Sequence, residues 1–300
     1  MTRIAVFGLG SMGLGMARSL LRAGHVVHGF DVNEDAVVKF RHEGGAEGVP
    51  AEALPQCGIA VTVVVNAAQT EAVLFAEAGI ASHLPEGAVV IGCATVPAAF
   101  ARDMERRLGE KGIHYLDAPI SGGAAKAAGG KLTMMTSGKP DAYARAEPAL
   151  TAMAEKVFRL GDEAGPGSAM KMVNQLLAGV HIAAAAEAIT FGMTQGIEPA
   201  QCVEVISQCA GTSWMFENRG PHIAEGDYAP RSAVEIFVKD LGIVGDIARE
   251  ERFAAPLAAT ALQQFLAASG MGHGREDDAA VAKVYARNAR LTLPGEDQGQ

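Results

Sequence analysis

Short runs of apolar, often β-branched residues alternate with amphipathic segments over the first half of the chain. The apolar runs lie at residues 4–7, 26–30, 59–65, 88–92 and 114–117. Segments with helical spacing of their apolar residues separate these runs. Strands that alternate with helices of this length are typical of βαβ units, which form a parallel sheet with helices on both faces. The pattern predicts a doubly wound α/β domain over residues 1–163.

The pattern changes after a glycine-rich stretch at residues 161–167. Residues 168–196 contain no proline and consist mainly of Ala, Leu, Met and Val, which predicts one long helix. Three later segments keep helical apolar spacing, at residues 199–209, 232–250 and 256–268. We therefore expect a second, all-helical domain over residues 164–300, joined to the first by the long helix. The last ten residues, 291–300, are polar, and we expect them to be frayed.

Composition and charge narrow the range of partners. The 300 residues are 49% hydrophobic and 20% charged, which is typical of a folded protein with a substantial core. A formal net charge of −9 argues against nucleic acid or an anionic membrane, because both require a basic surface. The residues after Met1 predict a strand, so we expect no leader peptide, and we expect no apolar run of the roughly 20 residues that span a bilayer. We expect a cytoplasmic protein.

The cysteines do not indicate a metal or redox site. Cys57, Cys93, Cys202 and Cys209 form no Cys-x-x-Cys pair, and no histidine lies near them at metal-ligand spacing. We expect reduced thiols in the core and no bound metal.

Glycines stand where the first predicted strand turns into the first predicted helix. Gly8, Gly10 and Gly13 form a Gly-x-Gly-x-x-Gly pattern directly after the apolar run. In a Rossmann domain the first glycine permits the tight turn, the second lets a pyrophosphate approach the backbone, and the third lets the helix pack on the strand. The phosphates would accept hydrogen bonds from the N–H groups at the helix start. The predicted cofactor-binding loop comprises Gly8, Leu9, Gly10, Ser11, Met12 and Gly13.

An acidic residue follows the second predicted strand. Asp31 lies close to the offset of about 20 residues at which a carboxylate binds the ribose hydroxyls of the adenosine. This carboxylate would repel a 2′-phosphate, and neither Val32 nor Asn33 is an arginine that could accept one. The sequence therefore favours NAD over NADP. The alternative is an ordinary turn in which Asp31 only caps the next helix.

Three further motifs, together with the glycine loop, resemble the β-hydroxyacid dehydrogenase family. They read DAPISGG at 117–123, GPGSAMKMVN at 165–174 and FVKD at 237–240. The family includes 3-hydroxyisobutyrate dehydrogenases and tartronate semialdehyde reductases, and the resemblance covers essentially the whole chain. It implies NAD-dependent oxidation of a small hydroxy acid in a cleft between a Rossmann domain and a helical domain. Residues 211–219 and 230–241 look most like the subgroup that oxidises the C2 hydroxyl of a four-carbon sugar acid.

Lys171 is the candidate general base. It lies near the start of a mostly apolar helix, where burial and the helix N-terminus favour a neutral amine that can take a proton from an alcohol. The resemblance places the catalytic lysine of the family at this position. It places the asparagine that orients the substrate at Asn174, on the same face of the helix. The alternative is a lysine that extends to water beside a helix start.

The resemblance also assigns the remaining site residues. The substrate carboxylate would bind Ser121, Gly122 and Gly123, which offer a hydroxyl and accessible backbone N–H groups; a plain glycine-rich turn is the alternative. The cofactor would contact Thr95, Phe237 and Lys239, and the loop at Val65 and Asn66 would pass beside it. For Lys239 the alternative is an exposed lysine at a helix end. The stretch before Thr95 departs from the family pattern, because it lacks the usual acidic residue and serine.

Alternative functions stay open on the sequence alone. The same scaffold would also suit a 3-hydroxyisobutyrate dehydrogenase, or an NADPH-dependent reductase of tartronate or succinic semialdehyde, although Asp31 counts against NADPH. A non-catalytic dinucleotide-binding regulator would not need Lys171 and Asn174. Ser213, Asn218 and Arg219 are candidates for binding outer hydroxyls, although each is better explained as a surface or capping residue. The apolar helical domain suggests a homo-oligomer, either a dimer or a tetramer.

Overall fold

The computed structural model describes residues 1–77 and 79–296 and divides into two compact units. Unit 1 comprises Met1–Lys171 and unit 2 comprises Met172–Gln300. Helix α8 (Pro166–Thr194) runs through this boundary, which falls within the helix rather than at the glycine-rich stretch before it. The first residues of α8 belong to unit 1, and the N–H and hydroxyl groups of Ser168 donate hydrogen bonds to Asp117 of the sheet domain.

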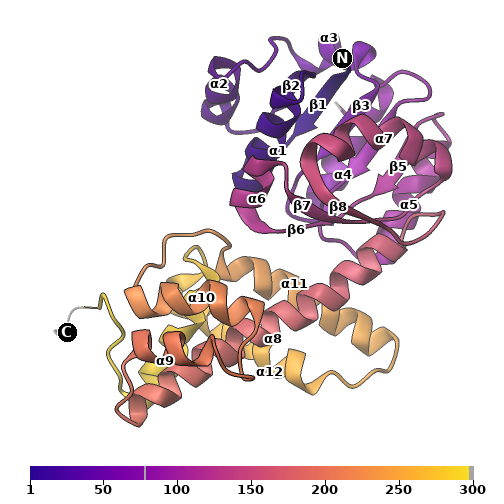
Figure 1. The fold of residues 1–300 in the computed structure, drawn as a ribbon. Coiled ribbons are helices and arrows are strands. Elements are labelled where there is room, and N and C mark those ends of the chain that lie inside the picture. The colour runs from indigo at the N-terminus through magenta and orange to yellow at the C-terminus, as the bar shows by residue number, and fades with distance from the viewer. Residues whose placement is uncertain (78, 297–300) are drawn as a thin grey trace. The chain divides into compact units, whose positions relative to one another are not determined.

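A five-stranded parallel sheet forms the centre of unit 1 (Figure 1). The strand order is β2-β1-β3-β4-β5, and every pairing is parallel. The strands are β1 (Arg3–Phe7), β2 (Val26–Phe30), β3 (Ile59–Thr62), β4 (Val89–Gly92) and β5 (His114–Asp117). The predicted doubly wound sheet is confirmed, with β3 shorter than expected.

Helices cover both faces of this sheet, as a parallel sheet requires. Ile4 and Val6 of β1 pack in one core with residues of α1, α6 and α7, whereas Ala5 and Phe7 pack in another with residues of α4 and α5. The helices of unit 1 before α8 are α1 (Ser11–Arg22), α2 (Glu34–His42), α3 (Pro50–Ala53), α4 (Ala67–Phe75), α5 (Ala98–Gly109), α6 (Gly123–Gly129) and α7 (Pro140–Met153), with 3₁₀ turns η1 (Leu54–Gln56) and η2 (Ile80–Ser82).

A second, three-stranded sheet in unit 1 was not predicted. Strand β7 (Leu132–Thr136) pairs antiparallel with β6 (Ile120–Ser121) and parallel with β8 (Ala154–Arg159). Strand β6 is two residues long, and β8 is largely exposed and charged, so neither shows a clear apolar pattern. Backbone hydrogen bonds of 3.0 and 2.8 Å between Asp117 and Ser137 connect this sheet to the end of β5.

The regular elements of unit 2 are helices in the described residues, as predicted, and one isolated β-bridge joins Ala233 and Asp277. Apart from α8 it contains α9 (Pro199–Ile206), α10 (Trp214–Glu225), α11 (Val234–Glu250), α12 (Pro256–Ala268) and α13 (Ala282–Ala289), with a π turn η3 (Ser269–His273) and a 3₁₀ turn η4 (Asp278–Val281). Its core includes Ile182 and Ile189 of α8 together with Phe265 of α12, all fully buried.

Two sequence-based expectations need correction. Helix α8 is long and apolar enough to cross a membrane by length and composition, with a mean hydropathy of 1.6 over its most apolar window, so the expectation of no such run is wrong. Half of that window is buried inside the protein, which is the pattern of a core helix, and no membrane is indicated. The expectation of core thiols holds for Cys57, Cys93 and Cys202 but is wrong for Cys209, which is exposed.

Candidate active site

The glycines of the loop between β1 and α1 differ in the space around them. A Cβ on Gly8, whose φ is +98°, would lie 2.3 Å from the carbonyl oxygen of Val63, and a Cβ on Gly13 would lie 1.9 Å from the carbonyl oxygen of Gly8. A Cβ on Gly10 would meet nothing within 4 Å. Packing within the protein therefore requires glycine at 8 and 13 but leaves open space at 10, as expected if a bound pyrophosphate approaches the backbone there.

The start of helix α1 is suited to an anion. Gly10 is its N-cap residue, no side chain caps the helix, and its first turn contains no acidic residue. The first N–H groups of a helix have no intrahelical partner, and they carry the positive end of the helix dipole. The N–H groups of Ser11, Met12 and Gly13 are in this position, so the loop fits the phosphates of a dinucleotide.

Asp31 is fixed beside this loop. Its Oδ2 accepts a hydrogen bond of 2.6 Å from the N–H of Leu9, and its Oδ1 accepts one of 2.8 Å from the N–H of Asn33. The residue that caps α2 is Asn33, whose Oδ1 accepts a hydrogen bond of 3.1 Å from the N–H of Asp35. The alternative that Asp31 only caps the next helix is therefore wrong.

The loops after β3 and β4 carry the other cofactor candidates of unit 1. Asn66 caps α4 by accepting a hydrogen bond of 2.9 Å from the N–H of Gln69, and Val65 donates its N–H to the Gln69 side chain at 2.8 Å. Thr95 is half-buried in the loop that follows β4. Since both loops follow carboxyl ends of parallel strands, they lie at the same edge of the sheet as the glycine loop and Asp31.

The loop that contains Thr95 also contains Cys93, in the stretch that departs from the family pattern. Cys93 is 5% exposed, and burial raises the pKa of its thiol. It therefore remains a neutral thiol in the core and offers no charged group to a ligand.

The turn from Ser121 to Gly123 joins β6 to α6. Gly122 and Gly123 have φ angles of +134° and +77°, which L side chains rarely adopt. Helix α6 packs against α1, where the Ser19 hydroxyl donates a hydrogen bond of 2.8 Å to the carbonyl oxygen of Ala127. The predicted carboxylate-binding turn is thus attached to the helix that begins at the glycine loop.

Lys171 lies beside this turn. Its side chain is only 8% exposed, and its Nζ donates a hydrogen bond of 2.8 Å to the carbonyl oxygen of Ile120. The amine therefore lies next to Ser121 rather than in water, and the alternative of a lysine that extends to solvent is wrong. The structure brings together two of the elements that the sequence predicts for substrate binding and proton transfer.

A buried carboxylate holds the start of α8 and thereby Lys171. The Oδ2 of Asp117 accepts hydrogen bonds from the N–H groups of Gly165 and Ser168 at 3.0 and 2.8 Å and from the Ser137 hydroxyl at 3.1 Å. Its Oδ1 accepts a hydrogen bond of 2.7 Å from the Ser168 hydroxyl. Burial raises the pKa of Asp117, and these hydrogen bonds oppose the shift. Asp117 was not among the predicted site residues, although it opens one of the quoted motifs.

The candidates of unit 2 form a chain of polar side chains between α8 and α11. Asn174 donates a hydrogen bond of 2.8 Å from its Nδ2 to the Oε1 of Gln175, and Gln175 donates from its Nε2 to the Oδ2 of Asp240. The Nζ of Lys239 lies 2.6 Å from the Oδ1 of Asp240. Asp240 is 1% exposed and the Lys239 side chain 21%, so the alternative of an exposed lysine at a helix end is wrong.

Sequence reasoning missed Gln175 and Asp240. Each stands immediately after a predicted site residue, Asn174 or Lys239, and that adjacency was the available signal. Phe237 is 3% exposed and stacks on Phe265 in the core of unit 2, with ring centroids 5.2 Å apart. Its contact with the cofactor stays a prediction.

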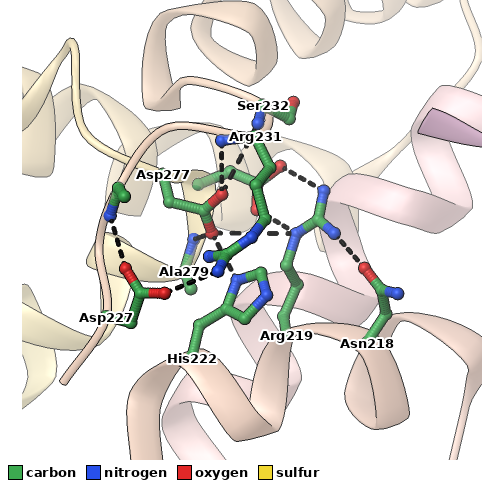
Figure 2. Close-up of polar contacts among 10 residues, drawn as sticks. Asn218, Arg219, His222, Asp227, Arg231, Ser232, Asp277 and Ala279 are labelled. Atoms are coloured by element: carbon green, nitrogen blue, oxygen red, sulfur yellow. Dashed lines mark hydrogen bonds and ion pairs between the residues drawn. The ribbon is translucent and has the colours of Figure 1, made fainter. Parts of the chain in front are cut away.

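Figure 2 shows a second polar cluster in unit 2, around Arg219. The Arg219 guanidinium donates to both carboxylate oxygens of Asp278, at 2.5 and 3.1 Å, and His222 Nδ1 lies 2.9 Å from Asp277 Oδ1. Asn218 accepts a hydrogen bond from Arg219. Ser213 caps α10 by accepting a hydrogen bond of 3.0 Å from the N–H of Phe216. Ser213 is thus a capping residue, as expected, whereas the expectation of a surface or capping residue is wrong for Arg219, which is 9% exposed and forms an ion pair with Asp278.

Comparison with known proteins identifies the family. Residues 3–161 match the family model described as the NAD binding domain of 6-phosphogluconate dehydrogenase, and residues 165–285 match that described as NAD-binding of NADP-dependent 3-hydroxyisobutyrate dehydrogenase. The chain is 54% identical to L-threonate dehydrogenase of Cupriavidus necator, over 97% of this chain and 98% of that protein. It belongs to the β-hydroxyacid dehydrogenase family.

Other members of the family support this assignment. The chain is 47% identical to L-threonate dehydrogenase of Escherichia coli (strain K12), over 97% of this chain and 96% of that protein. The crystal structure of 3-hydroxyisobutyrate dehydrogenase from Salmonella typhimurium matches with a TM-score of 0.90 at 47% identity, over 95% of this chain and all of that one. The expectation of an NAD-binding dehydrogenase with a small hydroxy acid as substrate is confirmed, and family membership counts against a non-catalytic regulator.

Proposed function

We propose that this enzyme oxidises the C2 hydroxyl of L-threonate to 2-oxo-3,4-dihydroxybutanoate. The observation that carries the proposal is the similarity to proteins named L-threonate dehydrogenase, at 54% and 47% identity over nearly their full lengths. The buried amine of Lys171 beside the Ser121 turn supplies the matching chemistry. NAD, when bound, supplies the acceptor for the hydride that leaves C2.

Lys171 acts as the general base in this proposal. As a neutral amine it keeps one N–H on the carbonyl oxygen of Ile120, and its lone pair accepts the proton of the C2 hydroxyl. The resulting ammonium group is stabilised by the same carbonyl. Because Asp117 holds the start of α8, the amine is already in position before the substrate arrives, which reduces the entropic cost of reaching the transition state.

The remaining predicted residues have binding roles in the proposal. Ser121, Gly122 and Gly123 bind the substrate carboxylate through the hydroxyl and backbone N–H groups, and Asn174 binds a substrate hydroxyl. The glycine loop binds the pyrophosphate, with Asp31 on the adenosine ribose. The fixed Asp31 carboxylate supports a preference for NAD over NADP, because a 2′-phosphate would meet like charge.

The domains divide these roles in the proposal. Residues 1–163 bind the dinucleotide, and residues 164–300 complete the substrate site and form an oligomer interface. Large apolar side chains are exposed in unit 2, with Phe253 at 65% and Leu257 at 71%, which supports association of copies of this chain. We propose a cytoplasmic dimer or tetramer. Light scattering coupled to size-exclusion chromatography measures its mass directly, and a monomer at micromolar concentration would contradict this part.

A substrate panel tests the proposed reaction. Purified enzyme is assayed with L-threonate, 3-hydroxyisobutyrate and D-glycerate, each with NAD and with NADP, by the absorbance of the reduced cofactor. We expect the highest kcat/KM for L-threonate with NAD. A pocket that hydrogen-bonds the outer hydroxyls rejects 3-hydroxyisobutyrate, because its polar groups would be left unpaired. Faster oxidation of 3-hydroxyisobutyrate or D-glycerate would refute the proposed substrate, and a preference for NADP would refute the assignment of Asp31.

A further inference from the structure

We infer that Gln175 is a positioning residue that fixes which end of the Asn174 amide faces the substrate. The inference rests on the proposed role of Asn174 in substrate binding. Gln175 is 6% exposed and lies between Asn174 on α8 and Asp240 on α11. It has no assigned role in the proposed reaction, yet a buried glutamine is costly unless both ends of its amide are hydrogen-bonded.

The charge of Asp240 sets the direction of every hydrogen bond in this chain. Asp240 is paired with the Lys239 ammonium group at 2.6 Å, and an ionised carboxylate can only accept hydrogen bonds. Gln175 must therefore turn its NH₂ group toward Asp240, which leaves its carbonyl oxygen for Asn174. Asn174 must in turn present its own NH₂ group to Gln175.

This order determines what Asn174 offers to a ligand. With one N–H of its NH₂ group donated to Gln175, Asn174 keeps its carbonyl oxygen Oδ1 and one N–H for other partners. Without Gln175, the NH₂ group of Asn174 loses the acceptor that favours this orientation, so the amide can rotate and turn its NH₂ group, instead of Oδ1, toward the substrate. The fixed orientation gives a hydroxyl of the substrate a defined acceptor in Oδ1.

The orientation should affect substrate binding more than cofactor binding. Leucine is similar in size to glutamine but has no hydrogen-bonding group, so Gln175→Leu breaks the chain of hydrogen bonds between Asp240 and Asn174. We expect KM for the hydroxy acid to rise at least about tenfold, the scale of one hydrogen bond near a charged group. KM for NAD and kcat should change by less than about threefold, because Asp240 keeps its ion pair with Lys239, the residue of this group that is predicted to contact the cofactor.

A matched control separates orientation from loss of stability. Thr190 is 3% exposed on the same helix and donates its hydroxyl to the carbonyl oxygen of Ala186 at 2.8 Å. Thr190→Val removes a buried hydrogen bond of α8 without touching the polar chain. Thermal unfolding of both variants shows their loss of stability, and only Gln175→Leu should raise KM for the acid. Equal KM values for the two variants would overturn the inference.

Gln175→Glu provides a second, pH-dependent test that a purely structural role would not pass. A buried glutamic acid beside Asp240 has its pKa raised by the like charge, so at low pH it keeps a proton and donates to Asp240 as glutamine does. When that proton is lost, the chain breaks. The ratio of its KM to that of the wild type should therefore fall as the pH is lowered from about 9 to about 6. The ratio for Gln175→Leu should stay constant.

A pH-independent ratio for Gln175→Glu would overturn the inference even if Gln175→Leu fails to fold. The assay uses L-threonate, or whichever acid of the substrate panel the wild type oxidises fastest. If that acid is not L-threonate, the proposed substrate is wrong, and the test of Gln175 proceeds unchanged with the other acid.

Discussion

Replacing Asp117 by Asn and by Ala should separate its hydrogen bonds from its charge. In Asp117→Asn, an amide carbonyl oxygen in the place of Oδ2 would still accept from the N–H groups of Gly165 and Ser168 and from the Ser137 hydroxyl, while the amide NH₂ group would donate to the Ser168 hydroxyl oxygen. Burial already raises the pKa of Asp117, so the folded state gains little from its charge. Asp117→Asn should therefore change the free energy of unfolding by only about 1 kcal/mol.

Asp117→Ala should be much more harmful. It leaves the buried N–H groups of Gly165 and Ser168 without an acceptor, at about 1–3 kcal/mol each, or about 2–6 kcal/mol together. It also releases the start of α8, and the amine of Lys171 lies only one turn further along. We expect kcat to fall at least about tenfold, since general-base catalysis depends on position.

Urea unfolding and steady-state kinetics of both variants test this reasoning. The measurements are made near neutral pH. There the Asp117 carboxylate of the unfolded chain is ionised, because an unfolded aspartate has a pKa of about 3.9. The wild type and Asp117→Asn therefore differ in charge as well as in hydrogen bonding. Similar activity in the wild type and Asp117→Asn, with a clear loss in Asp117→Ala, would support a positioning role through hydrogen bonds. If Asp117→Asn lost as much activity as Asp117→Ala, the charge itself would be required and the argument would fail.

Four further predictions concern the glycine loop, the base and a buried histidine. Lys171→Ala should keep its fold and NADH binding, measured by circular dichroism and fluorescence, but lose at least about a hundredfold in kcat; near-normal turnover would remove it from the mechanism. Asp31→Ala should raise KM for NAD while sparing NADP, and equal losses for both would contradict the ribose assignment. Gly10→Ala should weaken NAD binding with little change in Tm, whereas Gly13→Ala should lower Tm as well; calorimetry distinguishes them. Burial lowers the pKa of His28 below its usual 6.5. As the pH falls below 6.5, the unfolded chain therefore binds the proton first and the folded state loses stability. His28→Phe should lose less Tm than the wild type as the pH is lowered to about 5, and an equal loss in both would refute this.

The elements that sequence reasoning located correctly have continuous apolar sequences. The strands of the large sheet are covered on both faces, so they read as continuous apolar runs, and α8 is apolar on most sides. The glycine loop was recognisable because its spacing is local. By contrast, β6 is too short to show a period, and β8 exposes most of its residues, so the small sheet escaped detection.

The site residues that the sequence did not predict make contacts with residues far away in the chain. Gln175 and Asp240 are 65 residues apart, and nothing in the local pattern of either α8 or α11 predicts that their side chains meet. Asp117 likewise bonds to residues 48 and 51 positions further along the chain. In the sequence, only their position in or next to a motif indicated that these residues belong to the site. The sequence analysis considered only Asp31 as a cap of α2, and the structure shows that Asn33 caps this helix.

The three glycines of the cofactor loop are required for different reasons, and this has an evolutionary consequence. Gly8 lies against the backbone of Val63 and Gly13 against the backbone of Gly8, whether or not a cofactor binds, whereas a Cβ on Gly10 would meet no atom of the protein within 4 Å. A descendant of this protein that lost its catalytic role while keeping its fold should therefore retain the first and third glycines and drift at the second. Among homologues, a side chain at the position of Gly10 would be a better sign of a pseudoenzyme than a side chain at the position of Gly8 or Gly13.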